Sequence, residues 1–386
     1  MPPASTEIRP GQREGRLAGA PDNSSDRPPA DAGASARAST NRAPAGARVA
    51  GALALPVTLV VVVLATLLGP AHVSVGQALT ALAHRLTGHA DPHAWRETVI
   101  WSVRLPRALV GFVVGGGMAV AGAALQGLFR NPLADPGILG ISAGASLGAV
   151  LTIYGGLASR AVWVLPAGSF AGAAVNALFV FAIAARRGRG RVFTGTLLLV
   201  GVALGALSIA FTMFILSASL SSYDVGRQIM YWLIGGLEGR TWDHLLLGAP
   251  AVLLGAGVVY GQTRELDALL LGELAAQSVG VDVPRVRVRV VAAVSLVVGA
   301  AVAIAGPIGF VGLIVPHLLR LVVGAAHRGL VPLSFVGGGL FVVVADIVAR
   351  TLLAPAEIPV GIVTAALGAP FFLALLVRRD AATVTS

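Results

Sequence analysis

Long runs of apolar residues follow one another from residue 49 almost to the end of the chain, and they constrain the fold more than any other feature. A helix that crosses a bilayer needs about 20 mostly apolar residues, because each residue advances it by roughly 1.5 Å through a hydrocarbon core of roughly 30 Å. Hydrophobic residues make up 56% of the chain and charged residues 12%, which excludes a soluble globular fold. The sequence predicts an all-α, polytopic membrane protein.

The apolar runs are separated by breaks that contain glycine, proline or arginine, and their number indicates about ten transmembrane helices. We expect the spans at residues 49–68, 108–128, 138–154, 162–184, 192–216, 244–260, 288–305, 310–323, 333–348 and 360–377. Arginines cluster after the fourth and the tenth span, and loops rich in arginine usually stay in the cytoplasm. The sequence therefore predicts a multi-pass protein of the cytoplasmic membrane with both termini in the cytoplasm.

Residues 1–48 differ in composition from the rest of the chain. They are rich in proline, alanine, glycine, serine and arginine and have no apolar periodicity. We therefore expect a disordered cytoplasmic tail before a transmembrane domain at residues 49–386. The first apolar run begins about fifty residues from the N-terminus and has the length of a true span, so a cleaved signal peptide is not expected.

The charged residues narrow the possible functions. The net charge is +10, but no basic patch alternates with aromatic residues, so arginine-rich cytoplasmic loops explain the charge better than nucleic-acid binding does. The chain has no cysteine, which excludes disulfides and thiolate metal sites. It also has no lysine, so a phosphate-binding loop of the G-x-x-x-x-G-K-[ST] type cannot form, and ATP-driven work would need another subunit.

No residues stand in a pattern typical of a metal site, a cofactor site or a catalytic centre. Four histidines precede the second span, but no pair has a tight ligand spacing with a carboxylate, and we expect surface residues; these are His72, His84, His89 and His93. An intramembrane enzyme would need a nucleophile with a base, or a pair such as H-E-x-x-H, and the sequence contains neither motif. We therefore expect a protein that performs no chemistry on its substrate.

Asp346 lies inside a predicted span, where an acidic residue is costly and often functional. A secondary transporter driven by an ion gradient would use such a residue, although it would be expected to have several near the midplane. Arg350 follows four residues later on the same helical face. Local pairing with Arg350 is therefore the simpler explanation of this acid.

A polar segment at about residues 262–284 separates two apolar blocks. Its leucines recur at steps of three and four residues, which predicts amphipathic helix too polar to span a bilayer. Gly272 is expected to divide it into two short helices, and Gly280 to end the second, because glycine adopts the left-handed cap conformation without a clash. The segment is either an interfacial connection or a handle for a cytoplasmic partner.

Several long motifs resemble one known family. They read RLPR at 104–107, NPLADPGILG at 131–140, GPIGFVGLIVPHLLR at 306–320 and ADIVAR at 345–350. The sequence resembles the permease subunits of ABC importers for ferric siderophores, haem and cobalamin, which are FecCD-type subunits of type II importers. The matching positions of the structural motifs are Asn131, Pro132, Asp135, Pro136, Gly306, Pro307, Pro316, His317 and Asp346.

The resemblance implies ten helices per subunit, a second permease subunit, two cytoplasmic ABC ATPase subunits, an extracytoplasmic solute-binding protein and a metal-chelate substrate. Carried over by position, the arginines that dock the binding protein are Arg104, Arg107 and Arg350. Charge-assisted pairing with carboxylates would explain such a role, whereas for a single arginine anchoring of a helix end is the simpler explanation. The residues implied in coupling to the ATPase are Arg264, Leu266, Leu270, Gly272, Glu273 and Gly280.

The leading expectation is the permease subunit of an ATP-driven importer that moves a ferric siderophore across the cytoplasmic membrane. The same importer class carrying cobalamin or haem is an alternative, because no residue in the sequence distinguishes these substrates. An ion-coupled secondary transporter is the alternative from a different energetic class. The sequence does not decide between a homodimer and a heterodimer of permeases.

Overall fold

The computed structural model of the chain describes residues 45–69, 95–187, 194–220 and 222–384, with isolated positions between 74 and 87. The described residues form helices and connecting turns, with no strand among them. The long helices are α2 (Ala45–Leu67), α5 (Leu105–Leu128), α6 (Ile141–Tyr154), α7 (Val164–Arg187), α8 (Thr194–Ser219), α10 (Trp242–Gly261), α13 (Val283–Ala305), α14 (Val311–Val323), α15 (His327–Thr351) and α16 (Val360–Val384). The short ones are α4 (Trp95–Thr98), η1 (Val99–Arg104), η2 (Pro136–Leu139), α9 (Tyr223–Ile234), α11 (Thr263–Leu270) and α12 (Glu273–Ser278).

Each predicted span coincides with one of the long helices, which confirms the all-α polytopic fold. In the described part of the chain, seven helical stretches are long and apolar enough to cross a bilayer. Three apolar helices are shorter, namely Ile141–Tyr154, Val311–Val323 and Val360–Ala374. A helix of 13 residues such as α14 is about 20 Å long, so the predicted number of ten full spans is only approximate.

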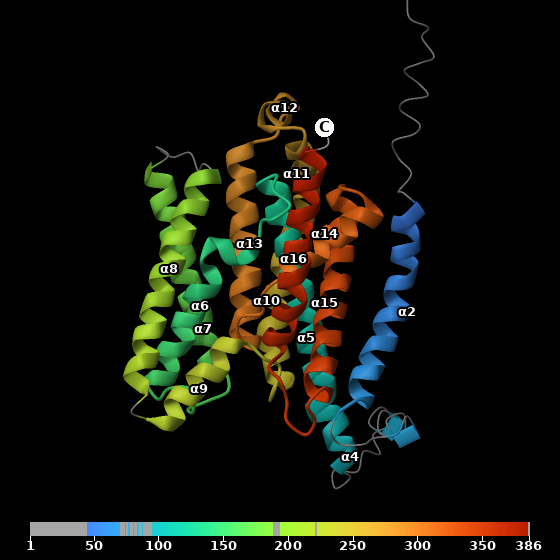
Figure 1. Cartoon of the computed structure of the whole chain (residues 1–386), viewed down its shortest axis with the longest axis vertical. Helices are drawn as coiled ribbons and strands as arrows, with labels where there is room; N and C mark the ends of the chain where they lie inside the picture. The colour runs from blue at the N-terminus through green and yellow to red at the C-terminus, as the bar shows by residue number, and fades with distance from the viewer. Residues whose placement is uncertain are drawn as a thin grey trace, which may run out of the picture. The chain divides into compact units, whose positions relative to one another are not determined.

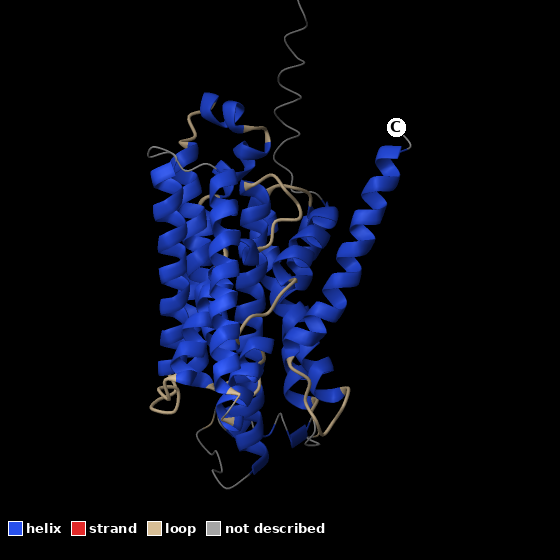
Figure 2. Ribbon diagram, turned by 60° about the vertical axis from the view of Figure 1, so that its left-hand side comes forward, coloured by secondary structure: helices blue, strands red, loops and turns tan. Residues whose placement is uncertain are grey.

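The helices run alongside one another between two ends of the molecule (Figures 1 and 2). Helices α11 and α12 lie at one end, called here the α12 end, and helix α2 begins and helix α16 ends there (Figure 1). Helices α4 and α9 lie at the opposite end, called here the α9 end (Figure 1). Most of the predicted tail, residues 1–44, lies outside the described residues, and α2 begins four residues before the predicted span.

Helix α5 is the most enclosed of the spanning helices, with 83% of its most apolar stretch buried. Its glycines permit this burial, because helices without side chains at their contact can bring their backbones together. A Cβ atom at Gly115 would overlap the carbonyl oxygen of Gly338 in α15, and one at Gly122 would overlap that of Gly312 in α14. These positions therefore fix how closely α14 and α15 approach α5.

Helices α6 and α7 also pack closely through glycines. A Cβ atom at Gly148 in α6 would overlap the carbonyl oxygen of Gly168 in α7, and one at Gly172 would overlap that of Gly144. Each helix thus offers two glycines one turn apart to the other, as in the small-xxx-small contacts of membrane helices. Helices α6 and α7 pack as one unit beside α13.

Three short elements lie where the sequence predicts only polar connections between spans. Helix α9 occupies the predicted outer loop between α8 and α10, and its residues Ile229 and Trp232 are buried. Helix α4 and the π-helix η1 precede α5, within the polar stretch after the first span. These three elements are too short and too polar to stand out as spans, so they gain their order from packing against neighbouring helices.

We expect Gly122→Leu to destabilise the bundle by about 1–3 kcal/mol, because the new side chain meets the backbone of α14, which cannot move aside cheaply. The matched control is Gly257→Leu in α10, where an added Cβ atom meets no heavy atom within 4 Å and the residue is exposed. Thermal unfolding in lipid nanodiscs measures both changes. An equal loss of stability in the two variants would contradict the close contact of α5 and α14.

Candidate functional site

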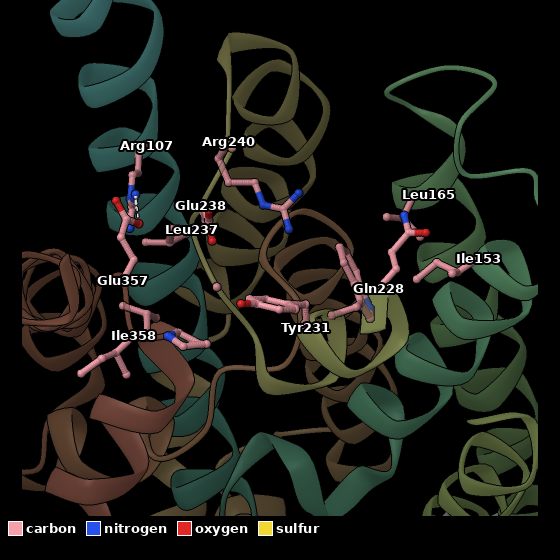
Figure 3. A pocket seen from close by; sticks show the side chains of 15 residues that line it. Arg107, Ile153, Leu165, Gln228, Tyr231, Leu237, Glu238, Arg240, Glu357 and Ile358 are labelled. Atoms are coloured by element: carbon pink, nitrogen blue, oxygen red, sulfur yellow. Dashed lines mark hydrogen bonds and ion pairs between the residues drawn. The ribbon is translucent and has the colours of Figure 1, made fainter. Parts of the chain in front are cut away.

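A cluster of arginines and carboxylates ties several helices together at the α9 end. The Arg107 Nε atom donates to Asp346 Oδ1 at 3.0 Å, and its Nη2 atom donates to the same oxygen at 2.8 Å. The Nη1 atom of Arg107 donates to Glu357 Oε2 at 2.7 Å, as Figure 3 shows. Arg107 therefore joins α5 to α15 and to the loop that precedes α16.

Two further arginines of the cluster close the C-terminal end of α2. The last carbonyl groups of a helix have no partner within the helix and carry its negative dipole end. Arg104 Nη1 donates to the carbonyl oxygens of Thr66 at 3.0 Å and Leu67 at 2.9 Å, and Arg350 Nη2 donates to that of Ala65 at 2.6 Å. These bonds fasten α2 to the start of α5 and the end of α15.

The three arginines implied in docking are buried, with 4% of Arg104, 7% of Arg107 and 2% of Arg350 exposed. Their partners in this structure lie within the chain, so the cluster stabilises the α9 end, and docking stays a prediction. The predicted local pair of Asp346 and Arg350 is present at 3.4 Å. The shorter contacts of Asp346 go instead to Arg107, which lies 239 residues away in sequence.

The predicted pair of short helices is present at the α12 end as α11 and α12. Gly272 separates them with a φ of 113°, and Gly280 follows the second with a φ of 87°. Glu273 forms an ion pair with Arg287 of α13, which fixes the start of α12. The division of this segment at Gly272 and its end near Gly280 are thus confirmed.

The side chains of this segment separate into an inner and an outer face. Leu266 is fully buried against the bundle, so its side chain packs within the chain, and its role in coupling to the ATPase stays a prediction. Leu270 is 37% exposed, Leu271 81% and Leu274 83%, and Arg264 is exposed as well. An exposed apolar patch on a polar segment typically marks an interaction surface.

A buried histidine connects α11 to α15. His327 is the first residue of α15 and has no exposed surface. Asp267 Oδ1 in α11 accepts a bond from the His327 backbone N–H at 2.7 Å and lies 2.7 Å from its Nδ1 atom. The carboxylate therefore satisfies an N–H group at the positive end of α15. No local pattern predicts this contact, because the two residues are 60 positions apart.

The first family motif forms a compact turn between α5 and α6. Asn131 Oδ1 accepts the Leu133 N–H at 3.0 Å, and Asp135 Oδ1 accepts the Gly137 N–H at 2.8 Å. Pro132 lies in the turn, and Pro136 begins η2 with its ring directly beside Gly312. The motifs at 131–140 and 306–320 therefore meet, although they are far apart in sequence.

The second motif bends the chain between α13 and α14. Gly306 has a φ of 70° and packs against Gly235, and the Gly236 N–H donates to the Ala305 carbonyl oxygen at 2.9 Å. Pro307 follows and contacts Gly235 through its carbonyl group. Within α14, Pro316 is buried, and the His317 ring lies edge-on to Phe371 of α16 at 6.1 Å.

A polar side chain of α5 supports the start of α14. Gln126 is 1% exposed, and its Nε2 atom donates to the carbonyl oxygens of Gly312 at 3.1 Å and Leu313 at 3.3 Å. Polar side chains of this kind hold membrane helices together where the hydrophobic effect cannot. Among the described residues, no group of three or more histidine, aspartate or glutamate side chains could hold a metal ion.

Comparison with known proteins identifies relatives along most of the chain. The model of the FecCD transport family matches residues 57–378. The chain is 47% identical over 287 residues to the cobalamin import system permease protein BtuC of Halobacterium salinarum, covering 74% of each chain. It is 44% identical over 290 residues to the vitamin B12 import system permease protein BtuC of Vibrio cholerae, covering 74% of this chain and 86% of the other.

A solved structure has the same fold. It is described as an inward-facing conformation of a metal-chelate type ABC transporter, and it is 31% identical in sequence with a TM-score of 0.74. The match covers 86% of this chain and 99% of the other. Together with the apolar helices and the family motifs, these similarities show that the chain belongs to the FecCD transport family and is a multi-pass permease of the ABC importer class.

Proposed function

We propose that the chain is the transmembrane permease subunit of an importer that moves cobalamin across the cell membrane. The observation that carries this proposal is the identity with permeases named for cobalamin import, which extends over about three quarters of the chain. Cobalamin therefore replaces a ferric siderophore as the leading substrate. Ferric siderophores and haem are the alternative substrates, and the transport experiment below tests them alongside cobalamin.

The energy would come from separate ATPase subunits, because a chain without lysine cannot form a phosphate-binding loop. We assign the α12 end to the cytoplasm. Helix α7 ends there with Arg186 and Arg187, in keeping with the tendency of arginine-rich loops to stay inside (Figure 1). An extracytoplasmic solute-binding protein would then dock at the α9 end, and a second permease subunit would complete the transporter.

Transport measurements test this function directly. Vesicles would contain the chain, its ATPase subunits and its solute-binding protein, and uptake of cobalamin, a panel of ferric siderophores and haem would be followed with and without ATP. We expect uptake of cobalamin that requires ATP. Uptake of a siderophore in place of cobalamin would overturn the proposed substrate, and uptake driven by a proton gradient without the ATPase would establish a secondary transporter.

The exposed leucines of α11 and α12 support a contact with the ATPase. Leu271 is 81% and Leu274 83% exposed, and helices α11 and α12 lie at the tip of the α12 end (Figure 1). Burial of one leucine side chain at an interface contributes about 1.5–3 kcal/mol. A groove on the ATPase that accepts these side chains would grip the two helices as a rigid unit.

We expect Leu274→Asp to weaken binding of the ATPase about tenfold or more, since the variant loses apolar burial and brings a charge into the contact. The side chain is 83% exposed, so the fold should be unaffected. The matched control is Leu157→Asp, which makes the same change at the α9 end. Equal binding of the ATPase to wild type and to the Leu274 variant would contradict the proposed contact.

The bond between Asp267 and His327 supports a route by which movement of α11 reaches α15. Helix α15 extends from this bond at the α12 end to Asp346 and Arg350 at the α9 end. Its backbone also lies directly against that of α5 at Gly338, which meets Gly115. We therefore propose that the contact of α11 with the ATPase displaces α15 and α5 together.

We expect Asp267→Ala to leave ATPase binding intact but to lower the amount of substrate moved per ATP hydrolysed by at least about fivefold, the lower range of typical coupling between sites. The matched control is Gln277→Ala in α12, an exposed position that lies outside this link. Transport and ATP hydrolysis would be measured in the same vesicles. An unchanged ratio in the Asp267 variant would exclude this route.

A further inference from the structure

A cavity of about 270 Å³ opens at the α9 end of the bundle. It lies between α9, the loop that follows α9 and the loop that precedes α16 (Figure 3). The polar residues that line it are Arg107, Gln228, Tyr231, Glu238, Arg240 and Glu357. Trp232, Leu237 and Ile358 form part of its apolar wall.

The two arginines of the cavity differ in how their charge is balanced. Arg107 is paired with Asp346 and with Glu357. Arg240 forms no ion pair with a carboxylate of the described residues, and its Nη1 atom lies 3.2 Å from His244 Nε2. Its side chain points towards Tyr231 and Gln228 in Figure 3. The cavity thus contains one guanidinium group without a counter-ion in contact.

Two hydrogen-bond donors in the cavity wall lack an acceptor. The Arg240 Nε atom is buried and makes no hydrogen bond, and the same holds for the Nε1 atom of Trp232, a residue that is only 6% exposed. The Arg240 guanidinium carbon lies over the Trp232 ring, 5.3 Å from its centre, so the two side chains are neighbours. Buried donors without partners are costly, and each calls for a physical explanation, of which a bound water or ion is one.

Arg240 carries a positive charge at neutral pH. Burial lowers the pKa of its guanidinium to about 10, while the charge of nearby Glu238 acts in the opposite direction. Glu238 is exposed and makes no ion pair with Arg240. The nearby acid therefore offsets the positive potential of the cavity only in part.

We propose that this cavity binds an oxyanion, a carboxylate or phosphate group, through the guanidinium of Arg240 and the indole N–H of Trp232. A planar guanidinium matches the geometry of such a group, and partial burial strengthens the bond. The volume suits one side chain or one phosphate group rather than a whole cobalamin molecule. The group would come either from an acidic side chain of the docking protein or from the substrate, and in both cases the inference rests on the proposed delivery of substrate at the α9 end.

The first test uses inorganic phosphate as the probe and needs no partner protein. The full chain in lipid nanodiscs would be unfolded by heat in phosphate and in chloride at equal ionic strength. We expect phosphate to raise the unfolding temperature of the wild type but not of Arg240→Gln or Trp232→Phe. The matched control Arg160→Gln removes an exposed arginine from the same end and should respond as wild type does. Equal stabilisation of all four proteins would overturn the site.

The second test identifies the source of the group in the complete transporter. We expect Arg240→Gln and Trp232→Phe to weaken either the binding of the solute-binding protein or the binding of the substrate about tenfold. Weaker binding of the substrate-free solute-binding protein would indicate a carboxylate on that protein. An increase in the substrate concentration for half-maximal uptake, with unchanged binding of that protein, would indicate a group on the substrate. No change in either step would overturn the proposal.

Two further variants separate anion binding from a structural role. Glu238→Gln removes a competing negative charge and should strengthen binding about twofold, whereas damage to the fold would weaken it. Arg240→Lys keeps the positive charge but loses the planar set of N–H donors of the guanidinium. It should therefore bind the anion more strongly than Arg240→Gln but more weakly than the wild type. A wild-type transporter that moves no cobalamin, but whose Arg240 and Trp232 variants lose phosphate stabilisation, would overturn the proposed substrate and leave the site standing.

Discussion

Direct contact between helix backbones around α5 is the constraint on which the rest of the structure depends. Inside a bilayer the hydrophobic effect does not draw helices together, so packing and polar bonds must do so. The glycines of α5 remove the side chains that would keep α14 and α15 away. Once α15 lies against α5, Asp346 comes within reach of Arg107, and the α9 end is fixed by that ion pair.

The helices themselves could be predicted from the sequence because each depends on local information. Apolar runs of span length located the long helices, and leucine periodicity with two glycines located α11 and α12. Helix α9 was missed because its 12 residues are too few for a span and its order comes from contacts with other helices. Helix α14 begins at Val311, one residue after the start of the predicted span, and the Gly306–Gly309 segment before it is not helical, as its glycines and proline indicate.

The contacts within the candidate sites could not be predicted in the same way, because they join residues that are distant in sequence. Spacing alone suggested Arg350 as the partner of Asp346, yet Arg107 makes the shorter bonds. Family resemblance marked the arginines as functional. It did not indicate that Arg104 and Arg350 donate hydrogen bonds to the carbonyl groups at the C-terminal end of α2. The same limit applies to Trp232 and Arg240, whose unused donors become visible only when their surroundings are known.

The bond between Asp267 and His327 also bears on how permeases of this kind can be recombined. The α11–α12 segment looks like a self-contained module, since glycines bound its second helix on both sides. Its Asp267 carboxylate, however, contacts the His327 ring of α15. That ring packs directly on Gly127 of α5, where any side chain would collide with the ring. A chimera that takes this segment from another permease must therefore also match residues in two other parts of the chain, His327 in α15 and Gly127 in α5.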